Sequence, residues 1–288
     1  MPLHALALAA FQAMPAPAAP VPAPSGDNDR LRACIALVRT APQQAMAEAQ
    51  AWLQEQGARR LLPRRCLGLA FAAQEQWAAA ATVYEQAAQD AEAANDPGRA
   101  GFRAQAGNAW LAAGEAQRAL QVLDAALTTT GLDQAQRGQA LLDRARAQVA
   151  LGHADRGRAD LDSALQLVPA DGFAWYLSAA LARRAGDAAR AASDIARARQ
   201  LSPDDPDVLL LAGTIVGQAG NMNEAYALYR RVVELAPDSE AGRQAAASLA
   251  TVREFEEDAP APGTAPAQTA PAPVPSQAST PAPAQPPR

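Results

Sequence analysis

Few side chains of this sequence have the types and spacing that catalysis needs. The 288 residues include two histidines, two cysteines and no lysine. His4 lies near the start of the chain and His153 directly follows Gly152, where a single imidazole is usually a solvated turn residue. A phosphate-binding loop G-x-x-x-x-G-K-[ST] requires a lysine, and a zinc cluster requires more cysteine and histidine ligands. We therefore expect no metal site, no cofactor and no catalytic nucleophile.

Paired carboxylates are the remaining candidates for chemistry, because two of them can hydrolyse a glycosidic bond. The chain has 30 acidic residues, but they occupy positions that we expect to face solvent on helices. Examples are Glu85, Asp124, Asp160 and Asp162. Solvated carboxylates lack the environment that tunes a catalytic acid or base. The sequence therefore predicts a protein that is not an enzyme.

The composition indicates close-packed helices. Alanine, the strongest helix former, accounts for 78 residues, and aromatic residues make up only 5%. Such a chain is poor in the residues that strands prefer, so we exclude the all-β classes. The net charge of -5 disfavours binding to a nucleic-acid backbone. The alanine and proline bias and the use of arginine alone suggest a GC-rich coding sequence and a bacterial protein.

Prolines separate the ends of the chain from its middle. Of 23 prolines, six lie in residues 1–24 and ten in residues 260–287. These ends have no apolar period, so we predict disordered Ala/Pro-rich arms at residues 1–25 and 259–288 and a folded part at residues 26–258.

The localisation stays open between two alternatives. Residues 3–14 form a short apolar run, and Ala16-Pro17-Ala18 resembles a cleavage site, as in a degenerate signal peptide that lacks a basic start. If residues 1–18 act as a signal peptide, the protein is exported to the periplasm; otherwise it is cytoplasmic. The sequence contains no run of 18 apolar residues, so it predicts no membrane span.

A period of 34 residues runs through the middle of the chain. Glycines and prolines keep this spacing in three successive units, and so do a small residue and a large residue four positions later. The residues are Gly152, Gly186, Gly220; Pro169, Pro203, Pro237; Gly157, Ala191, Ala225; and Leu161, Ile195, Tyr229. We expect a helix pair to turn at each glycine and the second helix to end at each proline.

These residues resemble the tetratricopeptide repeat, whose signature is W-x2-L-G-x2-Y, then A-x3-F, then P. Two units upstream also fit it, through Leu67-Gly68, Phe71, Ala80 and Tyr84, and through Gly107, Trp110, Ala119 and Leu123. The resemblance implies an all-α, right-handed α-solenoid of helix-turn-helix repeats. The expected units are a weak repeat at 29–59, repeats at about 62–94, 101–131, 138–169, 172–203 and 205–237, and a capping helix at 238–257.

The resemblance also implies a non-catalytic scaffold that binds a peptide or protein partner in a concave groove lined by the first helix of each pair. On the face away from the packing stripe we expect Arg65, Asn108, Leu142, Arg146, Tyr176, Arg183 and Leu210. Arginines pair with carboxylates, so the groove would suit an acidic segment. In a second interpretation these arginines are solvated and pair with Asp143 or Asp187. The alternative function is self-assembly into a homo-oligomer.

The two cysteines lie in first helices one repeat apart. Cys34 and Cys66 could form a disulfide that closes a loop of about 32 residues and contributes about 2–4 kcal/mol. Alternatively they are two buried free thiols on neighbouring helices.

Overall fold

The computed structural model describes residues 26–55 and 60–258, with side chains described as far as residue 251. Within these ranges the chain forms thirteen α-helices and no strand, which confirms the predicted all-α solenoid of helix pairs. The helices are α1 (Asp27–Thr40), α2 (Pro42–Gln54), α3 (Leu61–Ala72), α4 (Trp77–Ala93), α5 (Arg99–Ala112), α6 (Ala116–Thr128), α7 (Gln134–Ala150), α8 (Ala154–Leu167), α9 (Gly172–Arg184), α10 (Ala188–Leu201), α11 (Pro206–Gln218), α12 (Met222–Leu235) and α13 (Glu240–Asp258). The arms predicted at residues 1–25 and 259–288 lie outside the described residues.

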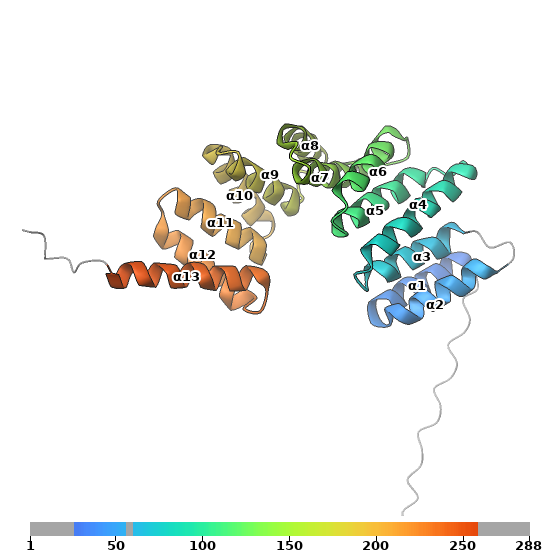
Figure 1. Ribbon diagram of the computed structural model, residues 1–288, viewed down its shortest axis with the longest axis horizontal. Coiled ribbons are helices and arrows are strands. Elements are labelled where there is room, and N and C mark those ends of the chain that lie inside the picture. The colour runs from blue at the N-terminus through green and yellow to red at the C-terminus, as the bar shows by residue number, and fades with distance from the viewer. Residues whose placement is uncertain (1–25, 56–59, 259–288) are drawn as a thin grey trace, which may run out of the picture.

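The helices stack into an open arch (Figure 1). α1–α3 form one foot of the arch, α13 forms the other, and α7 and α8 lie near its top. We call the odd-numbered helices first helices and the even-numbered helices second helices. Each first helix up to α11 packs against the second helix that follows it, and α5 also packs against α7, and α9 against α11. In contrast, α3 with α5, and α7 with α9, make little or no direct contact.

The predicted turns within the pairs occur at glycines with a left-handed backbone. Gly152 lies between α7 and α8 with a φ of 82°, a conformation that costs glycine little. Gly114, Gly186 and Gly220 occupy the same place in other units, with φ between 79° and 89°. In the turn between α3 and α4 this place is taken by Glu75, whose φ is 58°. The connections at residues 94–98, between α4 and α5, and at residues 129–133, between α6 and α7, are longer than those between the later units.

Pairs of small and large residues set the distance between the two helices of a unit. A Cβ added at Gly68 of α3 would lie 2.5 Å from the ring of Tyr84 in α4. The same addition at Gly213 of α11 would lie 2.6 Å from the ring of Tyr229 in α12. The close approach of the backbone to a large side chain therefore requires glycine at these two places.

Two units replace an apolar contact between their helices with polar groups. Ala106 and Val122 in one unit correspond to Arg144 and Asp160 in the next. Arg144 donates from Nε and Nη2 to the Asp160 carboxylate at 2.8 and 2.6 Å, and from Nη1 to Asp124 at 3.0 Å. In the following unit, Ser178 donates to the buried carboxylate of Asp194. These contacts hold α7 to α8 and α9 to α10.

The prediction that Asp160 faces solvent is therefore wrong, because this residue is only 8% exposed. The carboxylate enters the interface between α7 and α8 because Arg144 binds both of its oxygens there. The carboxylates of Asp124 and Asp162 are about half exposed, as expected, and Glu85 accepts a hydrogen bond from the Trp110 indole at 2.9 Å.

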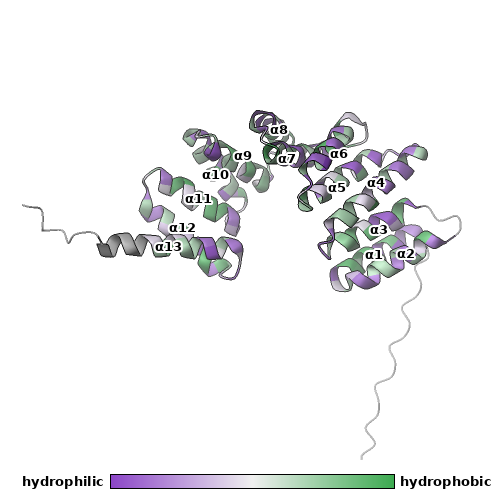
Figure 2. Cartoon of the chain, in the orientation of Figure 1, coloured by the Kyte–Doolittle hydropathy of each residue, from purple (hydrophilic) through white to green (hydrophobic). Residues whose placement is uncertain are grey.

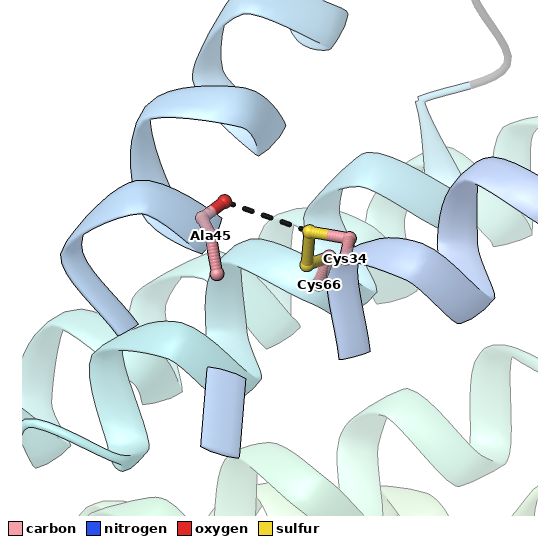
Figure 3. Close-up of a disulfide and its surroundings, with 3 residues drawn as sticks. All are labelled: Cys34, Ala45 and Cys66. Carbon is pink, nitrogen blue, oxygen red and sulfur yellow. Dashed lines mark hydrogen bonds between the residues drawn. A yellow bond between two sulfur atoms is a disulfide. The ribbon is translucent and has the colours of Figure 1, made fainter. Parts of the chain in front are cut away.

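The N-terminal pair is joined to α3 by a disulfide. Cys34 of α1 is bonded to Cys66 of α3, with 6.1 Å between their Cα atoms. Figure 3 shows the sulfur of Cys34 facing the carbonyl oxygen of Ala45 in α2, at 3.5 Å. Both cysteines are buried in a core cluster formed by α1–α4. The bond thus links the weak N-terminal repeat to the first unit that fits the repeat signature.

Every described helix carries both hydrophobic and hydrophilic residues (Figure 2), as expected where each helix buries one face. The buried apolar residues form three clusters, over α1–α4, α4–α9 and α9–α13. No helix in residues 26–55 or 60–258 is long and apolar enough to cross a membrane.

Candidate functional site

Three hollows open between the first helices of the central units. The central hollow, of about 490 Å³, lies among α3, α5 and α7 with α4 behind them. Its lining combines small or apolar residues such as Leu69, Ala72 and Tyr84 with amide and acidic side chains. The polar members are Gln105, Asn108, Gln136, Gln139 and Asp143. We call the path along the first helices α3, α5, α7 and α9 the groove.

Two smaller hollows extend the groove. The α3–α5 hollow, of about 260 Å³, is bordered by Arg65 and Gln105. The α7–α9 hollow, of about 380 Å³, is bordered by Arg146 and Arg184 and has the buried side chain of Leu161 among its lining residues. Each hollow lies where two first helices make little or no direct contact.

Three hydrogen-bonded side chains connect α5 to α7 along the groove. Asn108 Nδ2 donates to Asp143 Oδ2 at 3.0 Å, and Arg146 Nη1 donates to Asp143 Oδ1 at 2.9 Å. The Asp143 side chain is only 13% exposed. Burial raises the pKa of Asp143 above its ordinary value, while the bonds from Asn108 and Arg146 act in the opposite direction. Arg146 is thus partly neutralised by Asp143.

Arg65 and Gln105 carry polar groups that the described chain leaves available. Arg65 is exposed and forms no ion pair within residues 26–55 and 60–251. Burial raises the pKa of Tyr84 to about 12, and the nearby positive charge of Arg65 lowers it slightly. The Oε1 atom of Gln105 is buried and accepts no hydrogen bond from any described residue.

Tyr176 and Arg183 both lie on α9. The Tyr176 ring stacks on the exposed ring of Phe173, with 5.9 Å between centroids. Burial and the carboxylates of Asp207 and Asp205 raise the pKa of Tyr176, and the positive charge of Arg183 opposes them. The Nε atom of Arg183 is buried and has no hydrogen-bond partner among the described groups.

The structure thus brings Asn108 and Arg146 together through Asp143, while Arg65 lies at a separate hollow. Tyr176 and Arg183 lie on α9, but neither is among the residues that line the three hollows. Leu142, expected on the groove, is 1% exposed and belongs to the central core cluster instead. Its aliphatic side chain has no polar group to keep it in water, so it packs inward.

Arg184 and Gln105 are site residues that the sequence did not predict. Gln105 lies one helical turn before Asn108, a spacing that places both side chains on one face of α5. Arg184 follows Arg183 directly, and no sequence signal shows which of the two borders a hollow. Among the residues that the structure describes, no group of three His, Cys, Asp or Glu side chains could hold a metal ion.

The profile of the tetratricopeptide repeat family matches residues 182–249, which cover α10 to α12 and parts of their neighbours. This segment belongs to the tetratricopeptide repeat family. Solved structures share the fold over most of the array. No curated protein matches the sequence.

Three of these structures resemble this chain at low sequence identity. PilF of Pseudomonas aeruginosa is 14% identical, with a TM-score of 0.62, over 77% of this chain and 97% of its own. PilW, a type IV pilus biogenesis factor, is 18% identical, with a TM-score of 0.63, over 76% and 97%. The TPR protein TTC0263 of Thermus thermophilus is 20% identical, with a TM-score of 0.54, over 66% and 99%.

These likenesses establish the fold of the repeat array. The tetratricopeptide repeat fold generally serves as a protein-interaction scaffold, and its members are typically non-catalytic.

Proposed function

We propose that the groove along α3, α5, α7 and α9 binds an extended, acidic segment of a partner protein. The observation that carries this proposal is the row of three hollows, with arginines at the borders of two of them, in a chain whose net charge is -5. Arg65 borders the first hollow, and Arg146 and Arg184 border the last. A local excess of guanidinium groups attracts carboxylates, which they bind through paired hydrogen bonds.

The central hollow supplies groups that can bind a peptide main chain. Side-chain amides pair with backbone N–H and C=O groups, because they carry the same donors and acceptors. The buried Oε1 of Gln105 lacks a donor, and a peptide N–H would provide one. Asn108 uses its Nδ2 on Asp143, so its carbonyl oxygen is available to a second N–H.

In the second interpretation, the groove arginines are solvated and pair with Asp143 or Asp187. Such a pair is formed only by Arg146 among the described groove arginines. Arg146 is paired with Asp143, and Asp187 instead accepts from the backbone of Arg190 as a helix cap. Arg183 keeps a buried Nε without a partner, and Arg65 forms no ion pair with any described residue, although Asp96 lines the same hollow. These two arginines support the acidic segment more directly than Arg146 does.

The experiment compares peptide binding by the full chain and by two variants. Fluorescein-labelled peptides of about a dozen residues, acidic, neutral or basic, are titrated and followed by fluorescence anisotropy. The triple variant R65A/R146A/R183A is expected to lose about ten-fold or more in affinity for acidic peptides, as when charge-assisted hydrogen bonds are removed. The control variant R156A/R230A removes exposed arginines from the second helices α8 and α12 and is expected to bind as the wild type does.

The proposal is wrong if acidic peptides bind no better than neutral ones, or if the triple variant folds and binds them with unchanged affinity. Circular dichroism of each variant checks the fold, since all five arginines are replaced at positions at least partly exposed to solvent.

A further inference from the structure

We propose that the α7–α9 hollow is a specific pocket for one aliphatic side chain of the bound segment, with an acidic residue next to that side chain. This inference rests on the proposed function, because the pocket is one part of the groove. It assigns the position and the chemistry of a side chain that the proposed function leaves unspecified.

The pocket exists because α7 and α9 stand apart. On either side of it, α5 packs directly against α7, and α9 packs against α11. Between α7 and α9 there is little or no direct contact, and apart from the two arginines the side chains that face the gap are short or aliphatic. They include Val149 and Ala150 from α7, and Leu177, Ala180 and Leu181 from α9.

The floor of the pocket is apolar and deep. Leu161 of α8 lies behind the gap and is only 2% exposed. Water in such a place finds few hydrogen-bond partners, so an aliphatic side chain that replaces it gains from leaving the bulk solvent. The volume of about 380 Å³ lies at the lower end of the range for ligand pockets. It suits one side chain with its flanking main chain.

Charge at the mouth of the pocket specifies the neighbour of that side chain. Arg184 is exposed there and forms no ion pair or hydrogen bond within the described residues. Arg146 uses Nη1 on Asp143, and its side chain remains 38% exposed. Two guanidinium groups beside an apolar floor are complementary to an aliphatic residue followed by a carboxylate, and repel a basic one.

The test uses three labelled acidic peptides of equal length that differ at two adjacent central positions. One has Leu-Asp, one has Ser-Asp and one has Leu-Asn, and their affinities for the full chain are measured by fluorescence anisotropy. We expect the wild type to bind the Leu-Asp peptide about ten-fold more tightly than the other two, as for a side chain lost from an apolar pocket.

Two variants with matched controls locate this preference. The substitution Ala180→Leu fills the pocket from its border and is expected to abolish the preference for Leu over Ser, whereas Ala196→Leu adds the same side chain to an exposed place on α10 and leaves it intact. Arg184→Ala is expected to abolish the preference for Asp over Asn, whereas Arg156→Ala, on the exposed surface of α8, leaves it intact.

The outcomes separate this inference from the proposed function. If acidic peptides bind the wild type but Leu-Asp, Ser-Asp and Leu-Asn bind equally, the pocket is refuted and the groove stands. If the preference survives in Ala180→Leu, the aliphatic side chain binds elsewhere and the pocket is refuted. If none of the three peptides binds, the proposed function and this inference both fail.

Discussion

At the scale of single residues, the turn between α3 and α4 is strained, unlike the corresponding turns within the later helix pairs. Glu75 adopts a φ of 58° where four later units have a glycine with positive φ. A left-handed conformation costs a residue with a Cβ about 1–2 kcal/mol. Glycine removes this cost but loses more backbone entropy on folding, which offsets part of the gain. Glu75→Gly is therefore expected to raise the free energy of unfolding by about 0.5–1 kcal/mol. Urea denaturation measures this, with Gly152→Ala, expected to be destabilising, as the reverse control. Lower stability of Glu75→Gly would contradict the strain.

Asp143 gives the groove a pH dependence of stability. Its pKa is raised by burial, so the folded chain holds the proton more tightly than the unfolded chain does. Stability from this group is therefore full at low pH and declines as the pH rises from the ordinary aspartate pKa through the raised one. In Asp143→Asn this decline is expected to disappear, because the amide does not titrate. Thermal unfolding of both proteins across that interval decides the matter; parallel pH profiles would mean that Asp143 titrates as an ordinary aspartate.

At the scale of elements, the period in the sequence predicts which residues turn and which pack. The 34-residue spacing of glycines and prolines predicts helix pairs that turn at Gly152, Gly186 and Gly220, because only a few residue types suit those backbone positions. The polar contact between α7 and α8 could not be predicted in this way. Asp160 alone looks like a surface residue, and its burial depends on Arg144, 16 positions earlier on another helix. The prediction for Leu142 is wrong in the opposite sense, because this residue is expected at the surface of the groove and instead packs into the core.

The helix α11 provides a paired test of the packing between helices. Gly213 faces the ring of Tyr229, and an added Cβ would lie 2.6 Å from it, whereas a Cβ at Gly217 would lie 3.4 Å from Ala225. We expect Gly213→Ala to lower the free energy of unfolding by about 1–3 kcal/mol through overpacking. Gly217→Ala is expected to raise it by about 0.5–1 kcal/mol through helix propensity. Thermal unfolding of the two variants measures the difference, and equal effects would show that Tyr229 moves aside.

At the scale of the whole molecule, the fold follows from the sequence and the binding site only in part. The register on the first helices predicts Asn108, Arg146, Tyr176 and Arg183 as groove residues. The structure joins Asn108 and Arg146 through Asp143, whereas Tyr176 and Arg183 line none of the hollows. The sequence does not predict the gaps between α3 and α5 and between α7 and α9, because these gaps depend on how whole helices stack. The hollows, and with them Gln105 and Arg184, therefore appear only in three dimensions. Self-association stays a prediction that light scattering over a dilution series can test.

The disulfide is expected to determine how the N-terminal end of the array unfolds. Stability in a solenoid is local, and the cluster of α1–α4 is separate from the clusters that follow. Cys34 and Cys66 are 32 positions apart, and their bond is expected to stabilise this end by about 2–4 kcal/mol. Disulfides persist in oxidising compartments, so the bond favours the exported alternative.

Hydrogen exchange tests this role. Reduction with a dithiol, or the double variant C34A/C66A, is expected to speed exchange of the α1 and α2 amides and to leave α9–α12 unchanged. Equal exchange of α1 and α2 in the oxidised and reduced protein would show that packing alone holds this end.

The central claim is that the first helices α3, α5, α7 and α9 form one binding groove, and NMR of the isotopically labelled full chain tests it most directly. The chain is titrated with the acidic peptide containing Leu-Asp. We predict saturable shifts in the side-chain amides of Gln105, Asn108 and Gln139 and in the methyl groups of Ala150 and Ala180, with little change on α6 and α10. Shifts confined to those second helices, or no saturable shifts at all, would contradict the account.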